Sequence, residues 1–110
     1  MAVREVTPVE ALELVNGDAV LVDVREESEW EAGHAPMATL IPLATIPDHL
    51  DELPRDRLVV CVCRSGARSM RAATFLQENG VDAVNLEGGM IAWHGEDLPL
   101  ESAQGEATIN

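Results

Sequence analysis

The chain has 110 residues, the length of one ordinary domain, and 46% of them are hydrophobic, so it can bury a core of its own. Acidic residues outnumber basic ones 20 to 7, and the net charge of −13 disfavours binding to nucleic acids or to anionic membrane surfaces. The sequence has no apolar run long enough to span a bilayer and no signal-peptide pattern at its start, so we expect a cytoplasmic protein.

The first half of the chain alternates short apolar runs with short helical patterns. Thr7 and Pro8 are typical of a helix start, with Thr7 as the N-cap and Glu10 placed to close a capping box. That helix should extend to about Val15. The pattern then predicts a strand over 19–24, a short helix over 26–32, a strand over 39–42 and a short helix over 46–53.

The second half carries the clearest strand and the clearest helix. The strand is predicted over 58–62, and the helix over 68–79, with Gly80 just beyond its end. A strand over 83–86 and a helical turn over 90–93 follow. Strands that alternate with helices in this way indicate an α/β domain over residues 1–100, with about five mainly parallel strands and helices on both faces. The polar residues 101–110 show no pattern, and we expect a flexible tail there.

A basic segment interrupts this acidic chain. Between Arg57 and Gln77 there is no acidic residue, and four of the seven arginines and both cysteines fall within that segment. A cationic neighbourhood lowers the pKa of a thiol and attracts anionic substrates. The alternative is that these arginines only pair with the acidic remainder of the chain.

Cys63 lies where the predicted strand over 58–62 gives way to the helix over 68–79. At such a junction the helix presents free backbone N–H groups and the positive end of its dipole. Arg64 and Arg68 flank the thiol, and Gly66 allows the loop to curl so that its N–H groups point inward. We therefore predict that Cys63 has a lowered pKa and acts as a nucleophile.

Cys61 is expected to differ, because it lies within the strand and is best explained as a core residue. A role as a resolving thiol or as part of a Cys-x-Cys metal site stays open. A metal site would need two more ligands, and His34, His49 and His94 have no suitable spacing, so no metal is expected. With one residue between them, the two cysteines are poorly placed for a disulfide.

The segment Cys63-Arg64-Ser65-Gly66-Ala67-Arg68-Ser69 resembles the active-site loop of single-domain rhodaneses, the thiosulfate sulfurtransferase family. Other motifs of that family follow the same order along the chain: 21–25 with Glu29-Trp30 and Gly33-His34-Ala35-Pro36, then 85–90 with Trp93 and Leu98-Pro99. Two positions depart from the family pattern, Met37 and Asp97, where glycine is common. The resemblance covers residues 3 to 100 and implies the three-layer rhodanese fold.

The resemblance also implies a chemistry. Cys63 would take sulfane sulfur from an anionic donor such as thiosulfate, hold it as a persulfide, and pass it to a thiol or to cyanide, with no cofactor. The residues implied to bind the substrate are Arg64, Ser65, Gly66, Ala67 and Arg68. The residues implied to support the structure around the loop are Asp23, Arg25 and His34.

Two other functions remain as alternatives. Phosphatases and arsenate reductases of the same fold have five residues between the cysteine and the arginine of the loop, whereas only four separate Cys63 from Arg68 here. The fold also occurs in noncatalytic interaction modules. Those usually lack the cysteine, which this chain retains within a complete loop.

Overall fold

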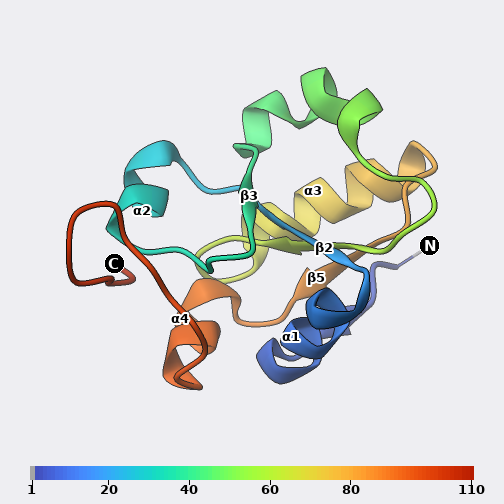
Figure 1. The fold of residues 1–110 in the computed structure, drawn as a ribbon. Helices are drawn as coiled ribbons and strands as arrows, with labels where there is room; N and C mark the ends of the chain where they lie inside the picture. Colours follow the sequence, from blue (N-terminus) through green and yellow to red (C-terminus); the bar gives the residue numbers. More distant parts are fainter. Residues whose placement is uncertain (1) are drawn as a thin grey trace.

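In the computed structural model, which describes residues 2–110, five strands form one parallel sheet in the order β1-β5-β4-β2-β3 (Figure 1). The strands are β1 (Glu5–Val6), β2 (Val20–Asp23), β3 (Thr39–Leu40), β4 (Val59–Val62) and β5 (Ala83–Leu86). Every pairing in the sheet is parallel, and β4 lies at its centre between β5 and β2. The predicted α/β class with a mainly parallel sheet is therefore confirmed.

Helices connect these strands. They are α1 (Pro8–Gly17), α2 (Glu27–Ala32), the 3₁₀ helix η1 (Leu43–Glu52), α3 (Ala67–Glu78) and α4 (Gly89–Gly95). Figure 1 shows α1 and α4 on one face of the sheet and η1 and α3 on the other, so the fold has three layers. The expected elements are all present, although the segment predicted as a helix over 46–53 begins earlier and is a 3₁₀ helix with Pro47 inside it.

The helix ends follow from local side-chain chemistry. The capping box is confirmed at α1, where the Thr7 hydroxyl accepts from the Glu10 N–H at 3.2 Å and the Glu10 carboxylate accepts from the Thr7 N–H at 2.8 Å. Beyond the carboxyl end of α3, Gly80 has a φ of 82°, which is the left-handed conformation expected just after a helix.

The central strand β4 divides the core into two layers, because successive side chains of a strand point to opposite faces. Val59 and Cys61 point toward η1 and α3, whereas Val60 and Val62 point toward α1 and α4. All four side chains are buried. Cys63, which follows the strand, joins the layer beneath η1 and α3.

Residues 101–110 were expected to form a flexible tail, and their mobility stays a prediction, but in the structure they have partners near α2. Glu101 pairs with His34 through two backbone hydrogen bonds of 2.8 and 2.9 Å. The Thr108 N–H donates to the Ala32 carbonyl at 2.9 Å. The segment therefore runs back along the end of α2.

Across the described residues, no helix is both long enough and apolar enough to cross a membrane.

Candidate active site

Cys63 lies at the carboxyl end of β4, directly before the loop that leads into α3. Its sulfur accepts a hydrogen bond from the Gly66 N–H at 3.1 Å and another from the Ser69 hydroxyl at 3.2 Å. Gly66 has a φ of 118°, a left-handed conformation that turns the loop back toward the sulfur. Cys63 itself is only 1% exposed. The loop therefore wraps the thiol and supplies donors to it.

The pKa of the Cys63 thiol lies below its ordinary value. Burial raises this pKa, but hydrogen bonds from the Ser69 hydroxyl and from the N–H groups of Ser69, Gly66 and Ser65 lower it by more. The direction agrees with the sequence analysis. The sequence analysis attributed part of the lowered pKa to arginine charge, whereas in the structure the hydrogen bonds of the loop lower it. A larger share of this thiol is therefore ionised at neutral pH than in an ordinary cysteine.

Cys61 has the opposite character. Its side chain is fully buried in the core layer beneath η1 and α3, and burial, together with the neighbouring Cys63, raises the pKa of its thiol to about 12. Both cysteines are free thiols. The interpretation of Cys61 as a core residue is confirmed, because it stays protonated at neutral pH and faces no solvent.

Arg68, in the first turn of α3, is bound to a residue that the sequence analysis gave no role. Its guanidinium donates to both carboxylate oxygens of Glu29, at 2.8 and 2.9 Å. The hydrogen bonds from Arg68 lower the pKa of Glu29 to about 2. Glu29 therefore anchors the helix end of the cysteine loop to α2.

The other predicted binding residues differ in their exposure. Arg64, Ser65 and Ala67 are exposed, and Gly66 is partly buried. The Arg64 side chain donates from Nε to the backbone oxygen of Asn110. Of the five predicted binding residues, Gly66 donates to the Cys63 sulfur, whereas Arg64 and Ala67 lie exposed on the solvent side of the loop.

The first turn of α4 holds the start of the cysteine loop through backbone hydrogen bonds. The Met90 N–H donates to the Cys63 carbonyl at 2.8 Å, and the Ile91 N–H donates to the Arg64 carbonyl at 3.1 Å. Gly89 has a φ of 61°, and a Cβ on it would lie 2.5 Å from the Cys63 carbonyl oxygen. The sequence analysis found the Gly88-Gly89 pair only as part of a family motif. Within the pair, Gly89 permits the close backbone contact with the loop.

Asp23 and Arg25 form a buried ion pair at the carboxyl end of β2. Arg25 Nε lies 3.0 Å from Asp23 Oδ1, and its Nη2 lies 2.8 Å from Asp23 Oδ2. The same Nη2 donates to the Gly33 carbonyl at 2.7 Å. These bonds join the end of β2 to the turn after α2, the helix that carries Glu29.

His34 lies on that turn. Its ring stacks on Trp30, with ring centroids 3.7 Å apart, and its Nδ1 lies 2.7 Å from the Trp30 carbonyl oxygen. Because a carbonyl oxygen only accepts, Nδ1 carries the hydrogen in this contact. Nε2 faces Glu101 at 3.7 Å. Among the described residues, its polar partners belong to α2 and to the segment after residue 100.

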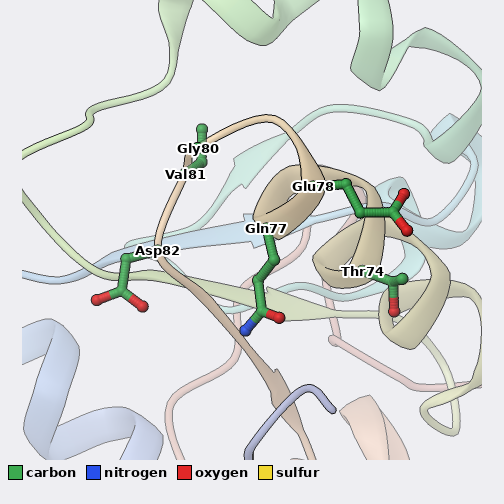
Figure 2. Close-up of a pocket in the computed structure, with 6 residues that line it drawn as sticks. All are labelled: Thr74, Gln77, Glu78, Gly80, Val81 and Asp82. Carbon is green, nitrogen blue, oxygen red and sulfur yellow. The ribbon is translucent and has the colours of Figure 1, made fainter. Parts of the chain in front are cut away.

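Two surface cavities flank α3. One, of about 430 Å³, lies at the far end of α3 (Figure 2) and is lined by Thr74, Gln77, Glu78, Gly80, Val81 and Asp82. It shares no residue with the cysteine loop. The other, of about 480 Å³, lies between η1 and α3 and is lined by Leu43, Ala44, Ile46, Pro47, Arg71, Ala72 and Phe75. Within residues 2–110, no three side chains of the types that bind metals come together.

Known proteins resemble this chain in sequence. The sequence model of the Rhodanese-like domain family matches residues 7–96. A protein of Allochromatium vinosum named "Sulfurtransferase" is 44% identical over 89 residues, which cover 80% of this chain and 83% of that protein. "Thiosulfate sulfurtransferase GlpE" of Pseudoalteromonas translucida is 33% identical over 95 residues, which cover 84% of this chain and 90% of that protein.

A solved structure agrees as well. The crystal structure of a rhodanese-like domain protein from Staphylococcus aureus superposes with a TM-score of 0.77 at 34% identity, over 96% of this chain and 98% of that one. The similarity to proteins named sulfurtransferases supports a transferase. With the family match spanning most of its length, the chain belongs to the rhodanese-like domain family.

Proposed function

We propose that this protein is a sulfurtransferase that moves sulfane sulfur from an anionic donor, thiosulfate, to a thiol or to cyanide through a persulfide on Cys63. The observation that carries the proposal is the environment of this thiol. It accepts hydrogen bonds from the Gly66 N–H and the Ser69 hydroxyl, and its pKa is lowered. The chain's other thiol, Cys61, has a pKa of about 12 and is therefore protonated at neutral pH.

In the first step the Cys63 thiolate attacks the outer sulfur of thiosulfate. A new sulfur–sulfur bond forms, the bond between the two sulfurs of thiosulfate breaks, and sulfite leaves with that electron pair. The persulfide that remains on Cys63 carries one negative charge. Backbone N–H groups of the loop hold this charge as they hold the thiolate. No general base is needed for the ionised thiol.

In the second step an acceptor thiolate or cyanide attacks the outer sulfur of the persulfide. The bond between that sulfur and Cys63 breaks, and its electron pair returns to the Cys63 sulfur. The overall exchange converts thiosulfate and cyanide into sulfite and thiocyanate, and the enzyme is regenerated. The step therefore consumes no oxidant and uses no cofactor.

We assign the donor site to the loop residues Arg64, Ser65, Gly66, Ala67 and Arg68. Because Glu29 pairs with the Arg68 guanidinium at 2.8 and 2.9 Å, we give Arg64 the larger part in binding the anionic end of the donor. The residues to which we give a supporting role are Asp23, Arg25 and His34. A nucleophilic free thiol suits a reducing compartment, and on this ground we propose a cytoplasmic location.

The experiment that tests the function compares wild type with Cys63→Ser and Cys61→Ala in two assays. One follows thiocyanate formation from thiosulfate and cyanide, and the other follows hydrolysis of a phosphate ester. We expect thiocyanate formation by wild type and Cys61→Ala and none by Cys63→Ser. Phosphate-ester hydrolysis that depends on Cys63 would indicate a phosphatase instead. Inactivity of the folded wild type in both assays would favour a noncatalytic module.

A further inference from the structure

Ser69 places a buried hydroxyl between the Cys63 sulfur and a second acceptor. Its side chain is on the first turn of α3, and the residue has no exposed surface. The Ser69 oxygen lies 3.2 Å from Cys63 Sγ, 2.5 Å from Asn85 Oδ1 and 3.4 Å from the Gly66 carbonyl oxygen. A hydroxyl has one hydrogen, so it donates fully to only one of these acceptors at a time.

Asn85, on β5, is held in one orientation. Its amide nitrogen donates to the Glu5 carboxylate at 3.0 Å and to the Gly66 carbonyl at 3.1 Å. Both partners are acceptors without a hydrogen, so both N–H bonds of the amide are used and a flipped amide would lose them. Asn85 is 1% exposed. Its Oδ1 is therefore a fixed acceptor that faces Ser69.

This arrangement makes Cys63 and Asn85 competitors for the same hydrogen. The Ser69 hydroxyl is within reach of both acceptors, and in the thiol form of Cys63 the S–H can donate to the Ser69 oxygen, which leaves the Ser69 O–H free for Asn85. When the sulfur is a thiolate or a persulfide, it is an acceptor, and the Ser69 hydrogen must leave Asn85 to reach it. A hydrogen bond to the charged form of a group favours that form.

We propose that Ser69 is a positioning residue of the sulfur-transfer site and that Asn85 limits its support of the negative sulfur by competing for the Ser69 hydrogen. The inference rests on the proposed function, in which Cys63 carries the sulfur. Ser69 and Asn85 occur in the motifs quoted from the sequence, but the sequence shows no contact between them.

Other groups act on the same sulfur, and the experiment leaves them in place. Arg68, paired with Glu29, adds positive charge near the thiolate, and Arg64 lies on the solvent side of the loop. The Glu5 carboxylate accepts a hydrogen bond from the Asn85 amide nitrogen. Cys61 is the remaining neighbour and is removed by using Cys61→Ala as the background, so that Cys63 is the only thiol.

The experiment follows the ultraviolet absorbance of the Cys63 thiolate as a function of pH. The chain contains no tyrosine, so no phenolate overlaps this signal. Ser69→Ala removes the donor and should shift the titration to higher pH by about one unit. Asn85→Leu removes the competing acceptor and should shift the titration to lower pH. If Asn85→Leu does not fold, Asn85→Ala is used in its place. Ser69→Thr keeps the hydroxyl and should restore the wild-type profile.

Thr74→Ala, on the exposed side of the same helix, is the matched control and should leave the profile unchanged. Circular dichroism checks that each variant is folded. A profile unmoved by Ser69→Ala would overturn the proposal. So would a shift to higher pH in Asn85→Leu, because Asn85 would then support the thiolate instead of competing with it. The titration needs no sulfur donor, so a failure of the proposed function would appear in the thiocyanate assay and not here.

Discussion

The Arg68 guanidinium binds both carboxylate oxygens of Glu29, at 2.8 and 2.9 Å, so the arginine that closes the cysteine loop is already paired within the protein. The pair joins α2 to the first turn of α3 across 39 residues of sequence. Two parallel bonds fix the guanidinium plane as well as its position. The site therefore has a rigid cation at the helix end of the loop and an exposed one, Arg64, at its start.

Replacing Arg68 should damage sulfur transfer more than replacing Arg57. In Arg68→Ala the loop loses its link to α2, and the Glu29 carboxylate is left unpaired at the helix end of the loop, where it repels an anionic donor. We expect kcat/KM for thiosulfate to fall about tenfold or more, the scale of one charge-assisted hydrogen bond. Arg57, exposed before β4 at the opposite end of the strand, is the matched control.

A second variant separates the two causes of that loss. Glu29→Gln combined with Arg68→Ala removes the unpaired charge, so the double variant should recover part of the activity that Arg68→Ala loses. Steady-state kinetics on wild type, Glu29→Gln, Arg68→Ala and the double variant measures the coupling between the two residues. Equal losses in Arg68→Ala and Arg57→Ala would instead mean that the arginines act only as a diffuse field.

The Glu29–Arg68 pair should also make stability depend on pH. Arg68 holds the pKa of Glu29 at about 2, below the ordinary value of 4.5, so the folded state binds its proton less readily than the unfolded state. The stabilisation is complete above about pH 4.5 and is lost as the pH falls toward 2. Urea unfolding should show wild type more stable than Glu29→Gln by less than about 1 kcal/mol at neutral pH. A difference that persists near pH 2 would exclude this ion pair as its source.

Gly89 should be intolerant of a side chain. A Cβ there would meet the carbonyl groups of Cys63 and Arg64, and the left-handed φ of 61° is strained for other residues. Gly89→Ala should lower the free energy of unfolding by about 1–3 kcal/mol and reduce sulfur transfer, because the loop must move. Gly95→Ala, in the same helix with open space around it, is the control. Equal stability of the two variants would contradict the close contact.

Loop length should separate sulfur chemistry from phosphorus chemistry. Inserting one glycine after Gly66 puts five residues between the cysteine and the arginine, as in the related phosphatases. The wider loop should lose N–H contacts to the persulfide, each worth about 3 kcal/mol in sites of this kind, and thiosulfate turnover should fall. Unchanged turnover in a variant that is folded by circular dichroism would show that loop length does not determine the chemistry.

The fold could be predicted from the sequence where local patterns decide the structure. The apolar run of β4 and the apolar face of α3, bounded by Gly80, mark two elements that tertiary packing did not alter. The segment 43–52 was harder, because Pro47 removes a backbone donor inside it and favours short 3₁₀ turns over a regular α-helix.

The position of Cys63 and the direction of its pKa shift could be predicted as well, since Cys63 lies at a strand-to-helix junction followed by Gly66. Its partners across the fold could not. Glu26, Glu27, Glu29 and Glu31 lie close together in sequence, and only the rotation of α2 determines that Glu29 faces Arg68.

Backbone contacts were the least predictable part of the site. The support of the loop by α4 and the return of residues 101–110 to α2 use N–H and carbonyl groups, which every residue has. In the sequence, such backbone contacts are indicated only by glycines at which a side chain would collide with the neighbouring backbone. Gly89 is close to the cysteine loop in this way, and Gly33 is close to Thr108.

The central claim is that Cys63 alone carries the transferred sulfur, and the intact mass of the protein after incubation with thiosulfate tests it most directly. Wild type and Cys61→Ala should each gain the mass of one sulfur atom, and cyanide should remove it. Cys63→Ser should gain nothing, because the thiol of Cys61, with a pKa of about 12, is protonated at neutral pH. A sulfur adduct on Cys63→Ser, or none on folded wild type, would contradict the account.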